Sequence, residues 1–345
     1  MKKKKVLNIL FSSTYSGAEN VACTIIENMK NDFDMLYCCP RGPVEKILKD
    51  RNIDYTFIDK LSYSKVRKVV KEYQPDIIHA HDYRAILIAS MFSRKCKIIA
   101  HVHVNNPLMI NRTKYSILFN YIFKKVDEII WVSDSAFDNF YYKNNVLNKS
   151  TVIYNIIDAQ YINKKAEAEE FKNKHDLIFL GRLSTQKNPE RLVEIVKLLK
   201  KQKEDISVAV VGDGEKRAIV ENLIKENDLT ENITLYGFKN NPYPILKASK
   251  MLIMTSDWEG TPMVALEAQA LNKPIISTPV DGMKKVIVND YNGFLSGDNE
   301  ELVAKILHFL NAKNYEKFVK NVEEHFKKIN DSKNYFERIK KIYNK

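Results

Sequence analysis

The sequence has 345 residues, of which 45% are hydrophobic, including 18 Tyr and 16 Phe. This is enough apolar surface for two cores of ordinary size, and ten Gly with ten Pro are too few for a fibrous or disordered chain. A net charge of +12 is compatible with anionic membrane, nucleic acid or phosphorylated ligands as partners, and equally with a lysine-rich solvated surface.

The cysteines and the first apolar segment indicate the compartment. The cysteines, Cys23, Cys38, Cys39 and Cys96, form no Cys-x-x-Cys pair, as expected of reduced thiols packed as small hydrophobic groups. The apolar segment from Val6 to Phe11 is too short for a signal peptide or a membrane span, and no later run qualifies. We therefore expect a cytoplasmic protein, with the inner face of the cell membrane as a second location to consider.

Short apolar runs alternate with helix-like segments along the first 160 residues, which is the pattern of βαβ units around a parallel sheet. The runs are Val6–Phe11, Met35–Cys39, Tyr55–Ile58, Asp76–His79, Lys97–His101 and Glu128–Val132. They predict a first Rossmann-like domain over residues 1–160.

The same pattern restarts after a polar, helix-prone stretch from Ala159 to His175, where we expect the two domains to join. The later runs are Leu177–Leu180, Ser207–Val211, Ile233–Tyr236, Met251–Met254 and Pro274–Ser277. They predict a second Rossmann-like domain over residues 161–325. From about Asn299 onward apolar residues recur at helical spacing, and we expect the helix of residues 326–345 to pack back onto the first domain.

Ligands of open α/β sheets bind beyond the carboxyl ends of the strands, so the loops after these runs carry the candidate chemistry. One such loop, Gly181 to Pro189, holds Arg182 and Lys187 just before a helix. A guanidinium and an ammonium beside a helix start can together bind a diphosphate. Two solvated loop charges are the alternative.

A second loop follows the run Met251–Met254 and contains two carboxylates, Glu259 and Glu267, with seven residues between them. Gly260 and Thr261 leave backbone N–H groups free at the start of the next helix, which begins near Pro262. Glu259 precedes this helix and Glu267 lies inside it, so the two carboxylates can face different parts of one ligand. The alternative is a capping residue and a buried, paired Glu.

Three stretches of the second half, Gly181 to Pro189, Asp257 to Glu267 and Pro274 to Gly282, closely resemble the second domain of the family 4 retaining glycosyltransferases. The resemblance implies the GT-B fold, an α/β architecture of two Rossmann-like domains facing across a cleft.

Three stretches of the first half agree with this resemblance. Ser16 to Glu19 resembles the family's Gly-Gly-Ala-Glu loop with Ser for the first Gly, which leaves Gly17 for close backbone approach. Asp76 to His81 looks like the His-x-His strand end of the family, and Val152 to Asp158 resembles the segment before the interdomain linker.

The resemblance implies how a nucleotide diphosphate sugar binds. Arg182 and Lys187 are expected to hold the diphosphate and stabilise charge on the departing nucleotide. Glu267 is expected to hold the ribose hydroxyls, and Glu259 to engage the donor sugar together with backbone N–H groups of the turn that follows it. The further expected donor contacts are Ser16, Gly17, Gly181, Gly212, Gly237, Gly260, Thr261, Pro262, Met263 and Val264.

One histidine completes the expected catalytic set of His103, Arg182, Lys187 and Glu259. His103 matches the active-site histidine of the family, and alignment of the strand end favours it over His101, two residues earlier on the same side of the strand.

The resemblance implies a retaining glycosyltransferase that is expected to move a hexose-type sugar to a growing, lipid-linked surface glycan such as a capsule or exopolysaccharide. A UDP-sugar is favoured over a GDP-sugar as donor, with no cofactor and no metal. The alternatives are a non-catalytic GT-B partner subunit and a sugar-nucleotide epimerase or hydrolase on the same fold. Nucleic acid is not an expected partner, because no recognised binding module is present.

Two motifs have the form of a metal site and of a dinucleotide site, and neither assignment is supported. Asp32-Phe33-Asp34 has the Asp-x-Asp form of metal-dependent glycosyltransferases of the other major fold, but it lies in a polar connection without a partner motif. Gly212-Asp213-Gly214 lacks the third glycine of a dinucleotide fingerprint, because Arg217 stands there, so NAD binding is not supported. In the family that the chain resembles, this turn lies near the nucleotide site.

The segment from Arg112 to Lys125 places aromatic and aliphatic residues between basic ones, as a helix on a membrane surface does. Tyr115, Phe119, Ile122 and Val126 in and just after it also form an ordinary core face. Core packing and contact with an anionic membrane are both open at this stage.

Overall fold

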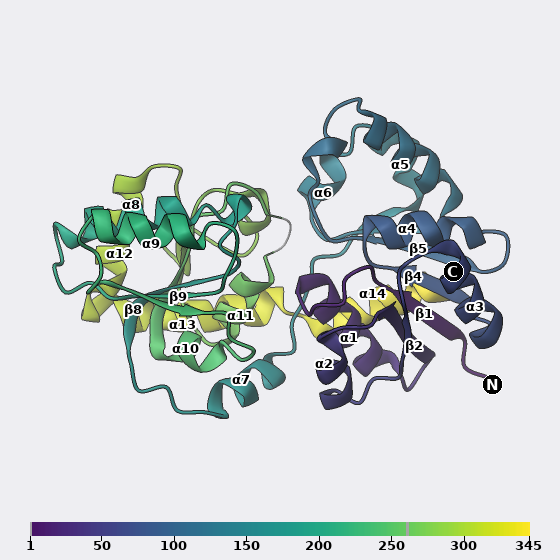
Figure 1. Ribbon diagram of the computed structural model, residues 1–345, viewed down its shortest axis with the longest axis horizontal. Coiled ribbons are helices and arrows are strands. Elements are labelled where there is room, and N and C mark those ends of the chain that lie inside the picture. Colours follow the sequence, from purple (N-terminus) through teal and green to yellow (C-terminus); the bar gives the residue numbers. More distant parts are fainter. Residues whose placement is uncertain (1, 260–261) are drawn as a thin grey trace. The chain divides into compact units, whose positions relative to one another are not determined.

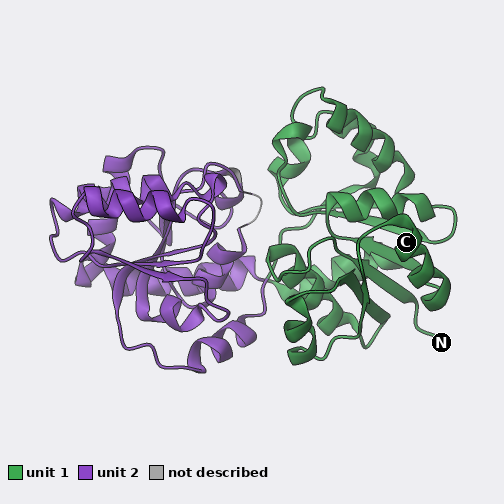
Figure 2. Ribbon diagram, in the orientation of Figure 1, with its two compact units in different colours: residues 1–156, 331–345 green, residues 157–330 purple. Residues whose placement is uncertain are grey.

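The computed structural model describes residues 2–259 and 262–345. The chain forms two compact units, here called unit 1 and unit 2 (Figure 2). Unit 1 consists of Met1–Ile156 and Asp331–Lys345, and unit 2 consists of Ile157–Asn330.

Unit 1 is built on a seven-stranded parallel sheet with the order β3-β2-β1-β4-β5-β6-β7. The central strands β2, β1, β4 and β5 are labelled in Figure 1. The strands are β1 (Lys5–Ile9), β2 (Asp34–Pro40), β3 (Tyr55–Ile58), β4 (Ile77–Ala80), β5 (Lys97–Val102), β6 (Glu128–Trp131) and β7 (Ser150–Val152). Its helices are α1 (Gly17–Met29), α2 (Val44–Asp50), α3 (Tyr63–Tyr73), α4 (Tyr83–Ala89), α5 (Lys114–Lys125), α6 (Asp134–Asp138) and α14 (Ser332–Asn344).

The sheet of unit 1 is covered on both faces. Apolar side chains of α3, α4 and α5 form one core with alternate residues of the strands. Residues of the opposite alternation pack toward α1 and α14, where His79 contacts Tyr343. The buried face of α14 comprises Tyr335, Ile339, Ile342 and Tyr343, which confirms that the last helix returns to the first domain. It begins at Ser332 and not at residue 326, because α13 continues to Ile329 within unit 2.

Unit 2 is built on a six-stranded parallel sheet with the order β10-β9-β8-β11-β12-β13. The strands are β8 (His175–Leu180), β9 (Val208–Val211), β10 (Ile233–Gly237), β11 (Ser249–Met254), β12 (Ile275–Ser277) and β13 (Gly293–Leu295). Its helices are α7 (Ala159–Glu167), α8 (Pro189–Lys200), α9 (Arg217–Glu226), α10 (Tyr243–Ala248), α11 (Met263–Ala270), α12 (Asn299–Leu310) and α13 (Ala312–Ile329).

Two hydrophobic cores cover the faces of this second sheet. Helices α8, α9 and α12 contribute to one of them, and α7, α10 and α11 to the other. Ile162 and Ala166 of α7 are buried in the second core, so much of the polar stretch after Ala159 is a packed helix of unit 2.

The predicted α/β class with two Rossmann-like sheets is confirmed, and each apolar run of the sequence corresponds to a strand. The structure adds β7 and β13, which are edge strands of three residues. Edge strands that short carry too little apolar alternation to stand out in a sequence.

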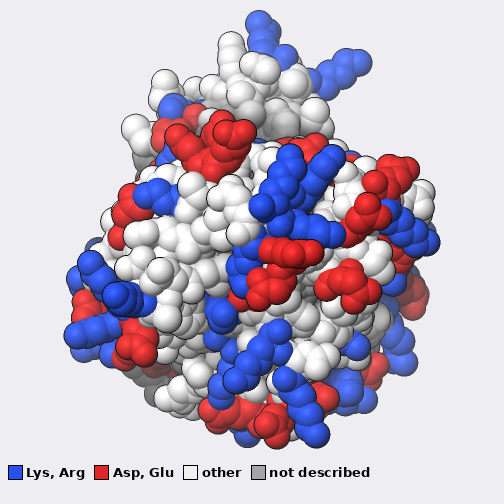
Figure 3. Space-filling model, turned by 90° about the vertical axis from the view of Figure 1, so that its left-hand side faces the viewer, with Lys and Arg blue, Asp and Glu red and all other residues white. Residues whose placement is uncertain are grey.

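Basic and acidic side chains are interspersed over the face of the molecule drawn in Figure 3. This distribution fits the solvated-surface interpretation of the net charge on that face. Within residues 2–259 and 262–345, none of the helices combines the length and the apolar character that crossing a bilayer requires.

Candidate functional site

The loop between β8 and α8 presents Lys187 at the carboxyl end of the sheet of unit 2. Thr185–Lys187 form a 3-10 turn, after which Asn188 adopts a left-handed conformation with φ of 44°. The Asn188 side chain accepts a hydrogen bond from the Arg191 N–H, and Pro189 occupies the first helical position. The helix start that the sequence predicted after Lys187 is therefore fixed by its own capping residues.

Lys187 is paired with Glu259 from the loop after the neighbouring strand β11. Lys187 Nζ lies 2.5 Å from Glu259 Oε1, and the two side chains are 18% and 8% exposed. The same carboxylate oxygen accepts a hydrogen bond from Ser256 Oγ at 2.8 Å. Gln186 Nε2 donates to the Trp258 carbonyl oxygen at 3.0 Å, which ties the two loops together.

Buried hydroxyl groups fix the backbone beneath this pair. Thr255 Oγ1 donates to the carbonyl oxygens of Lys187 and Asn188, with 2.9 Å for each contact. Thr278 Oγ1 donates to the Ser256 carbonyl oxygen at 2.6 Å. Thr255 directly follows β11 and Thr278 directly follows β12. Their hydrogen bonds therefore link the loops after β8, β11 and β12 to one another.

Glu267 lies inside α11, in surroundings that disfavour its charge. Burial raises the pKa of the Glu267 carboxyl to about 7, while a hydrogen bond with Tyr243 and the charge of Lys187 act in the opposite direction. Lys187 therefore interacts electrostatically with both carboxylates of the Glu-x7-Glu stretch.

Glycines allow three strand ends of unit 2 to approach closely. Gly212 has φ of 140°, and a Cβ atom on it would lie 1.9 Å from the Gly181 carbonyl oxygen. The Gly212 N–H donates to the Gly237 carbonyl oxygen at 2.9 Å, and Gly237 has φ of 66°. Side chains at Gly212 or Gly237 would strain this edge of the sheet.

The remaining predicted donor residues of unit 2 are less enclosed. Arg182 is exposed and makes no side-chain hydrogen bond or ion pair with another described residue. Pro262 is the N-cap of α11, and Met263 and Val264 are half-buried in its first turn. Gly260 and Thr261 lie outside the described residues.

Ser16 and Gly17 belong to unit 1, at the start of α1. Ser16 is the N-cap residue, and its backbone N–H and its hydroxyl both donate to Glu19 Oε2, at 3.1 and 2.5 Å. Burial raises the pKa of the Glu19 carboxyl. Ser16 therefore organises the loop through this contact, and Gly17 is the first residue of the helix.

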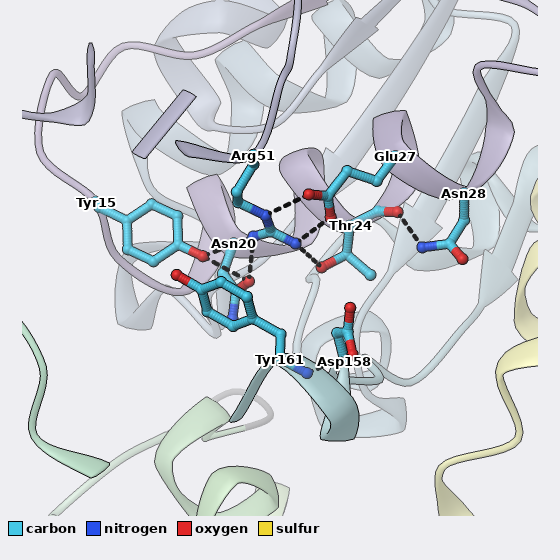
Figure 4. A network of polar contacts seen from close by, with 8 residues as sticks. All are labelled: Tyr15, Asn20, Thr24, Glu27, Asn28, Arg51, Asp158 and Tyr161. Atoms are coloured by element: carbon cyan, nitrogen blue, oxygen red, sulfur yellow. Dashed lines mark hydrogen bonds and ion pairs between the residues drawn. The ribbon is translucent and has the colours of Figure 1, made fainter. Parts of the chain in front are cut away.

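A buried arginine holds the segment around Ser16 in place (Figure 4). Arg51 bonds both carboxylate oxygens of Glu27, with Nε donating to Oε1 at 2.8 Å. Its Nη1 atom donates to Tyr15 Oη at 2.8 Å and to Asn20 Oδ1 at 3.0 Å (Figure 4). This network joins the residue before Ser16 to α1 and to the end of α2.

Four histidines lie together at the carboxyl ends of β4 and β5 in unit 1. His79 Nε2 and His101 Nδ1 are 3.2 Å apart, and so are His81 Nδ1 and His103 Nε2. Burial lowers the pKa of His79 and of His103 to about 3, and it lowers the pKa of His81 and His101 well below the usual value. All four rings are therefore neutral at pH 7.

The two candidates for the active-site histidine differ in access. His101 is completely buried within β5, whereas His103 follows the strand and is half-buried. Among the described residues, His79, His81 and His101 are the one group of side chains whose nitrogen, sulfur or carboxylate atoms lie close enough to bind a metal ion together.

Two family models match the chain, and they divide it as the two sheets do. Residues 15–161 match Glycosyltransferase Family 4, and residues 161–325 match Glycosyl transferases group 1. The chain belongs to the family 4 glycosyltransferases. The resemblance that the sequence suggested is therefore confirmed.

Several curated proteins are similar to this glycosyltransferase along most of its length. A UDP-Gal:alpha-D-GlcNAc-diphosphoundecaprenol alpha-1,3-galactosyltransferase of Escherichia coli is 27% identical, with 90% of this chain and 87% of that protein covered. The capsular polysaccharide biosynthesis glycosyltransferase CapH of Staphylococcus aureus is 26% identical, with 80% and 81% covered. For an uncharacterized glycosyltransferase of Methanocaldococcus jannaschii, 28% identical, the match spans 66% of this chain and 62% of the relative.

Among solved structures, HepE of Anabaena in complex with UDP and glucose superposes with a TM-score of 0.85 at 18% identity, covering 99% of both chains. This likeness shows that the glycosyltransferase has the GT-B fold.

Sequence reasoning missed the residues that support the charged pair. Ser256 and Gln186 stand in the two loops that the sequence singled out, and their positions next to Glu259 and Lys187 were a usable signal. Tyr243 comes from α10, and nothing in its local sequence indicates that it contacts Glu267.

Proposed function

We propose that this glycosyltransferase is an active, retaining and metal-independent enzyme that transfers a hexose-type sugar from a nucleotide diphosphate sugar to a lipid-linked surface glycan. The observation that carries the proposal is the pairing of Lys187 with Glu259 at the strand ends of unit 2. Glu267 lies near enough for the charge of Lys187 to act on the pKa of its carboxyl. A non-catalytic partner subunit has no physical need for a lysine paired with one acidic residue and in electrostatic contact with a second.

The chemistry of this group suits loss of a nucleotide diphosphate. Breaking the bond between sugar and phosphate leaves negative charge on the diphosphate and positive character on the sugar. Lys187 and the exposed Arg182 stabilise the first of these charges, and Glu259 lies beside Lys187 where it can stabilise the second. The acceptor oxygen then enters from the face that the diphosphate leaves, and the diphosphate accepts its proton, so the anomeric configuration is kept.

The proposed donor is a UDP-sugar. The Escherichia coli relative is named for UDP-Gal, and structures of HepE contain UDP, UDP with glucose, or UDP-glucose. The same relative is named for an acceptor attached to diphosphoundecaprenol, and CapH for capsular polysaccharide biosynthesis. The first name supports a lipid-linked acceptor for this chain, and the second supports a surface polysaccharide as the product.

An apolar and basic surface on α5 supports contact with the membrane that carries such an acceptor. The expected core face of this helix is buried, with Phe119 and Ile122 each 2% exposed. On its other side Ile117, Leu118 and Tyr121 are exposed, next to Lys124 and Lys125. Apolar side chains flanked by lysines fit the surface of an anionic bilayer.

The proposal is tested by donor binding and product analysis. Thermal unfolding is measured with UDP-glucose, UDP-galactose, UDP-N-acetylglucosamine and GDP-mannose, because a ligand that binds the folded state raises Tm. The preferred donor is then incubated with an undecaprenyl diphosphate-linked sugar in EDTA, and the new linkage is analysed by NMR. We expect transfer with retained configuration. An inverted linkage, loss of transfer in EDTA, or epimerised donor without transfer would each refute the proposal.

A further inference from the structure

The four histidines of unit 1 form two separate hydrogen-bonded pairs with different ends. His81 pairs with His103, and His81 Nε2 lies 3.2 Å from Asn8 Oδ1 on β1. His79 pairs with His101, and His79 Nδ1 lies 2.8 Å from Tyr343 Oη on α14. Each pair therefore ends on a polar side chain from another element of the unit.

The Asn8 end determines where the protons of its pair lie. A neutral imidazole has one N–H and one lone pair, and the carbonyl oxygen of an amide only accepts. His81 Nε2 must therefore carry the hydrogen that it donates to Asn8 Oδ1, which leaves a lone pair on His81 Nδ1. His103 Nε2 must in turn donate to that lone pair. The remaining nitrogen, His103 Nδ1, then has a lone pair and no hydrogen.

In the second pair, the contact with Tyr343 places a hydrogen on the last nitrogen, whereas the last nitrogen of the first pair has none. The phenol hydrogen of Tyr343 is buried, and His79 Nδ1 is the acceptor at hydrogen-bond distance. When the phenol donates, His79 Nε2 donates to His101 Nδ1, and the hydrogen of His101 stays on its Nε2 atom. The last nitrogen of the first pair, His103 Nδ1, is thus a hydrogen-bond acceptor, and the last nitrogen of the second pair, His101 Nε2, is a donor.

Both end atoms are buried and without a hydrogen-bond partner among residues 2–259 and 262–345. The rings that carry them are neighbours, with centroids 4.0 Å apart. Unpaired buried polar atoms are rare in folded proteins and indicate a group that is satisfied by something else, such as a ligand.

We propose that Asn8 and His81 are positioning residues that hold His103 in the tautomer protonated at Nε2, so that His103 Nδ1 accepts a hydrogen bond from a hydroxyl group of the sugar. The role given to His103 rests on the proposed function, whereas the tautomer rests on the orientation of the Asn8 amide, in which Oδ1 faces His81 and the buried Nδ2 has no hydrogen-bond partner among residues 2–259 and 262–345. The geometry also accounts for the two histidines at each strand end. His81 orients His103, and His79 forms the neighbouring pair with His101.

The tautomer is measured directly by two-bond 1H–15N correlation NMR of the full chain labelled with 15N-histidine. The protein has only seven histidines, and single His→Asn variants assign the signals. We expect both His81 and His103 to be protonated at Nε2. Protonation of His103 at Nδ1, which the reverse orientation of the Asn8 amide would produce, overturns the proposal. So does one equivalent of tightly bound metal on His79, His81 and His101.

Two variants test the dependence on Asn8. Asn8→Leu removes the acceptor and keeps the branched shape and the number of heavy atoms in the side chain. We expect it to shift the signals of His81 and His103 while those of His79 and His101 stay in place. Tyr343→Phe is the matched control, because it removes one hydroxyl from the other pair and should shift His79 and His101 instead. Unchanged His81 and His103 signals in a folded Asn8→Leu variant would exclude a positioning role for Asn8.

The role of His103 Nδ1 is tested with amide substitutions that mimic one ring nitrogen each. The amide of Asn reaches the place of Nδ1, whereas that of Gln reaches the place of Nε2. We expect kcat with the preferred UDP-sugar to be about tenfold higher for His103→Asn than for His103→Gln, at similar KM. Equal or reversed values contradict the role of Nδ1. A wild-type protein without any transfer contradicts the proposed function, and the NMR result then decides the tautomer separately.

Discussion

Lys187 Nζ lies 2.5 Å from Glu259 Oε1, although the two residues are 72 positions apart in the sequence. Their loops follow β8 and β11, which are neighbours in the sheet, and this adjacency brings the two side chains together. In the proposed donor site, a diphosphate that binds Lys187 would share the ammonium with Glu259. The ion pair would then orient Lys187 toward the bond between the sugar and the diphosphate.

Replacing Lys187 with Ala should abolish most sugar transfer. We expect kcat to fall at least about 100-fold, the usual effect of removing one group that stabilises charge in a transition state. The free energy of unfolding should fall by about 1–3 kcal/mol, because Glu259 keeps its buried position and loses its partner. Initial rates with a UDP-sugar and urea unfolding measure the two effects.

Lys203 provides the matched control for that variant. Its Nζ atom lies 3.8 Å from Asp176 Oδ2. Asp176 is near the amino end of β8, whereas Lys187 follows the carboxyl end of the same strand. Lys203→Ala should transfer sugar at the wild-type rate. If Lys187→Ala does so too, the donor-site assignment is wrong.

Gly212→Ala should destabilise the edge of unit 2 that carries the charged pair. The new Cβ atom would lie 1.9 Å from the Gly181 carbonyl oxygen, and φ of 140° is unfavourable for any residue with a side chain. We expect a loss of at least about 2 kcal/mol in the free energy of unfolding. Gly297→Ala is the control, because its Cβ atom would meet nothing within 4 Å and its Tm should stay unchanged. Equal Tm values for the two variants would refute this explanation.

Glu267 should make stability depend on pH. Its folded-state pKa of about 7 lies above the unfolded value of 4.5, so its contribution to stability is complete below pH 4.5 and is lost as pH rises to 7. Relative to Glu267→Gln, which has no ionisable group there, the wild type should lose up to about 3 kcal/mol between these pH values. Urea unfolding of both proteins across this range measures the difference. A difference that does not change with pH would show that the carboxyl is not held in its neutral form.

The fold could be predicted almost completely from the sequence, whereas the contacts within the site could not. Apolar runs between helical segments revealed the central strands because these strands are buried on both faces. Lys187 and Glu259 could be assigned to strand-end loops, but their pairing depends on the strand order, which places β11 beside β8. The roles of Asn8 and Tyr343 depend on which side chains meet across the sheet and its helices. Such contacts join residues far apart in the chain, so local sequence does not predict them.

The exposed side of α5 provides a test of membrane association. Ile117, Leu118 and Tyr121 are 44–60% exposed, and Lys125 Nζ lies 4.3 Å from the centre of the Tyr121 ring. Because all three project away from the core, their replacement should leave the fold intact. Ile117→Glu combined with Leu118→Glu removes apolar surface and adds negative charge, both of which oppose binding to an anionic bilayer.

The measurement is sedimentation with vesicles of phosphatidylglycerol and phosphatidylcholine at low salt, where surface electrostatics are least screened. Wild-type protein should sediment with the vesicles, and the double variant should stay in the supernatant. Ile219→Glu is the control, because Ile219 of unit 2 is 47% exposed and lies outside the proposed surface. If the wild type stays in the supernatant, or if Ile219→Glu reduces binding as strongly as the double variant, α5 is not a membrane-binding surface. Loss of wild-type binding at high salt would identify the lysines beside these residues as the electrostatic part of the attraction.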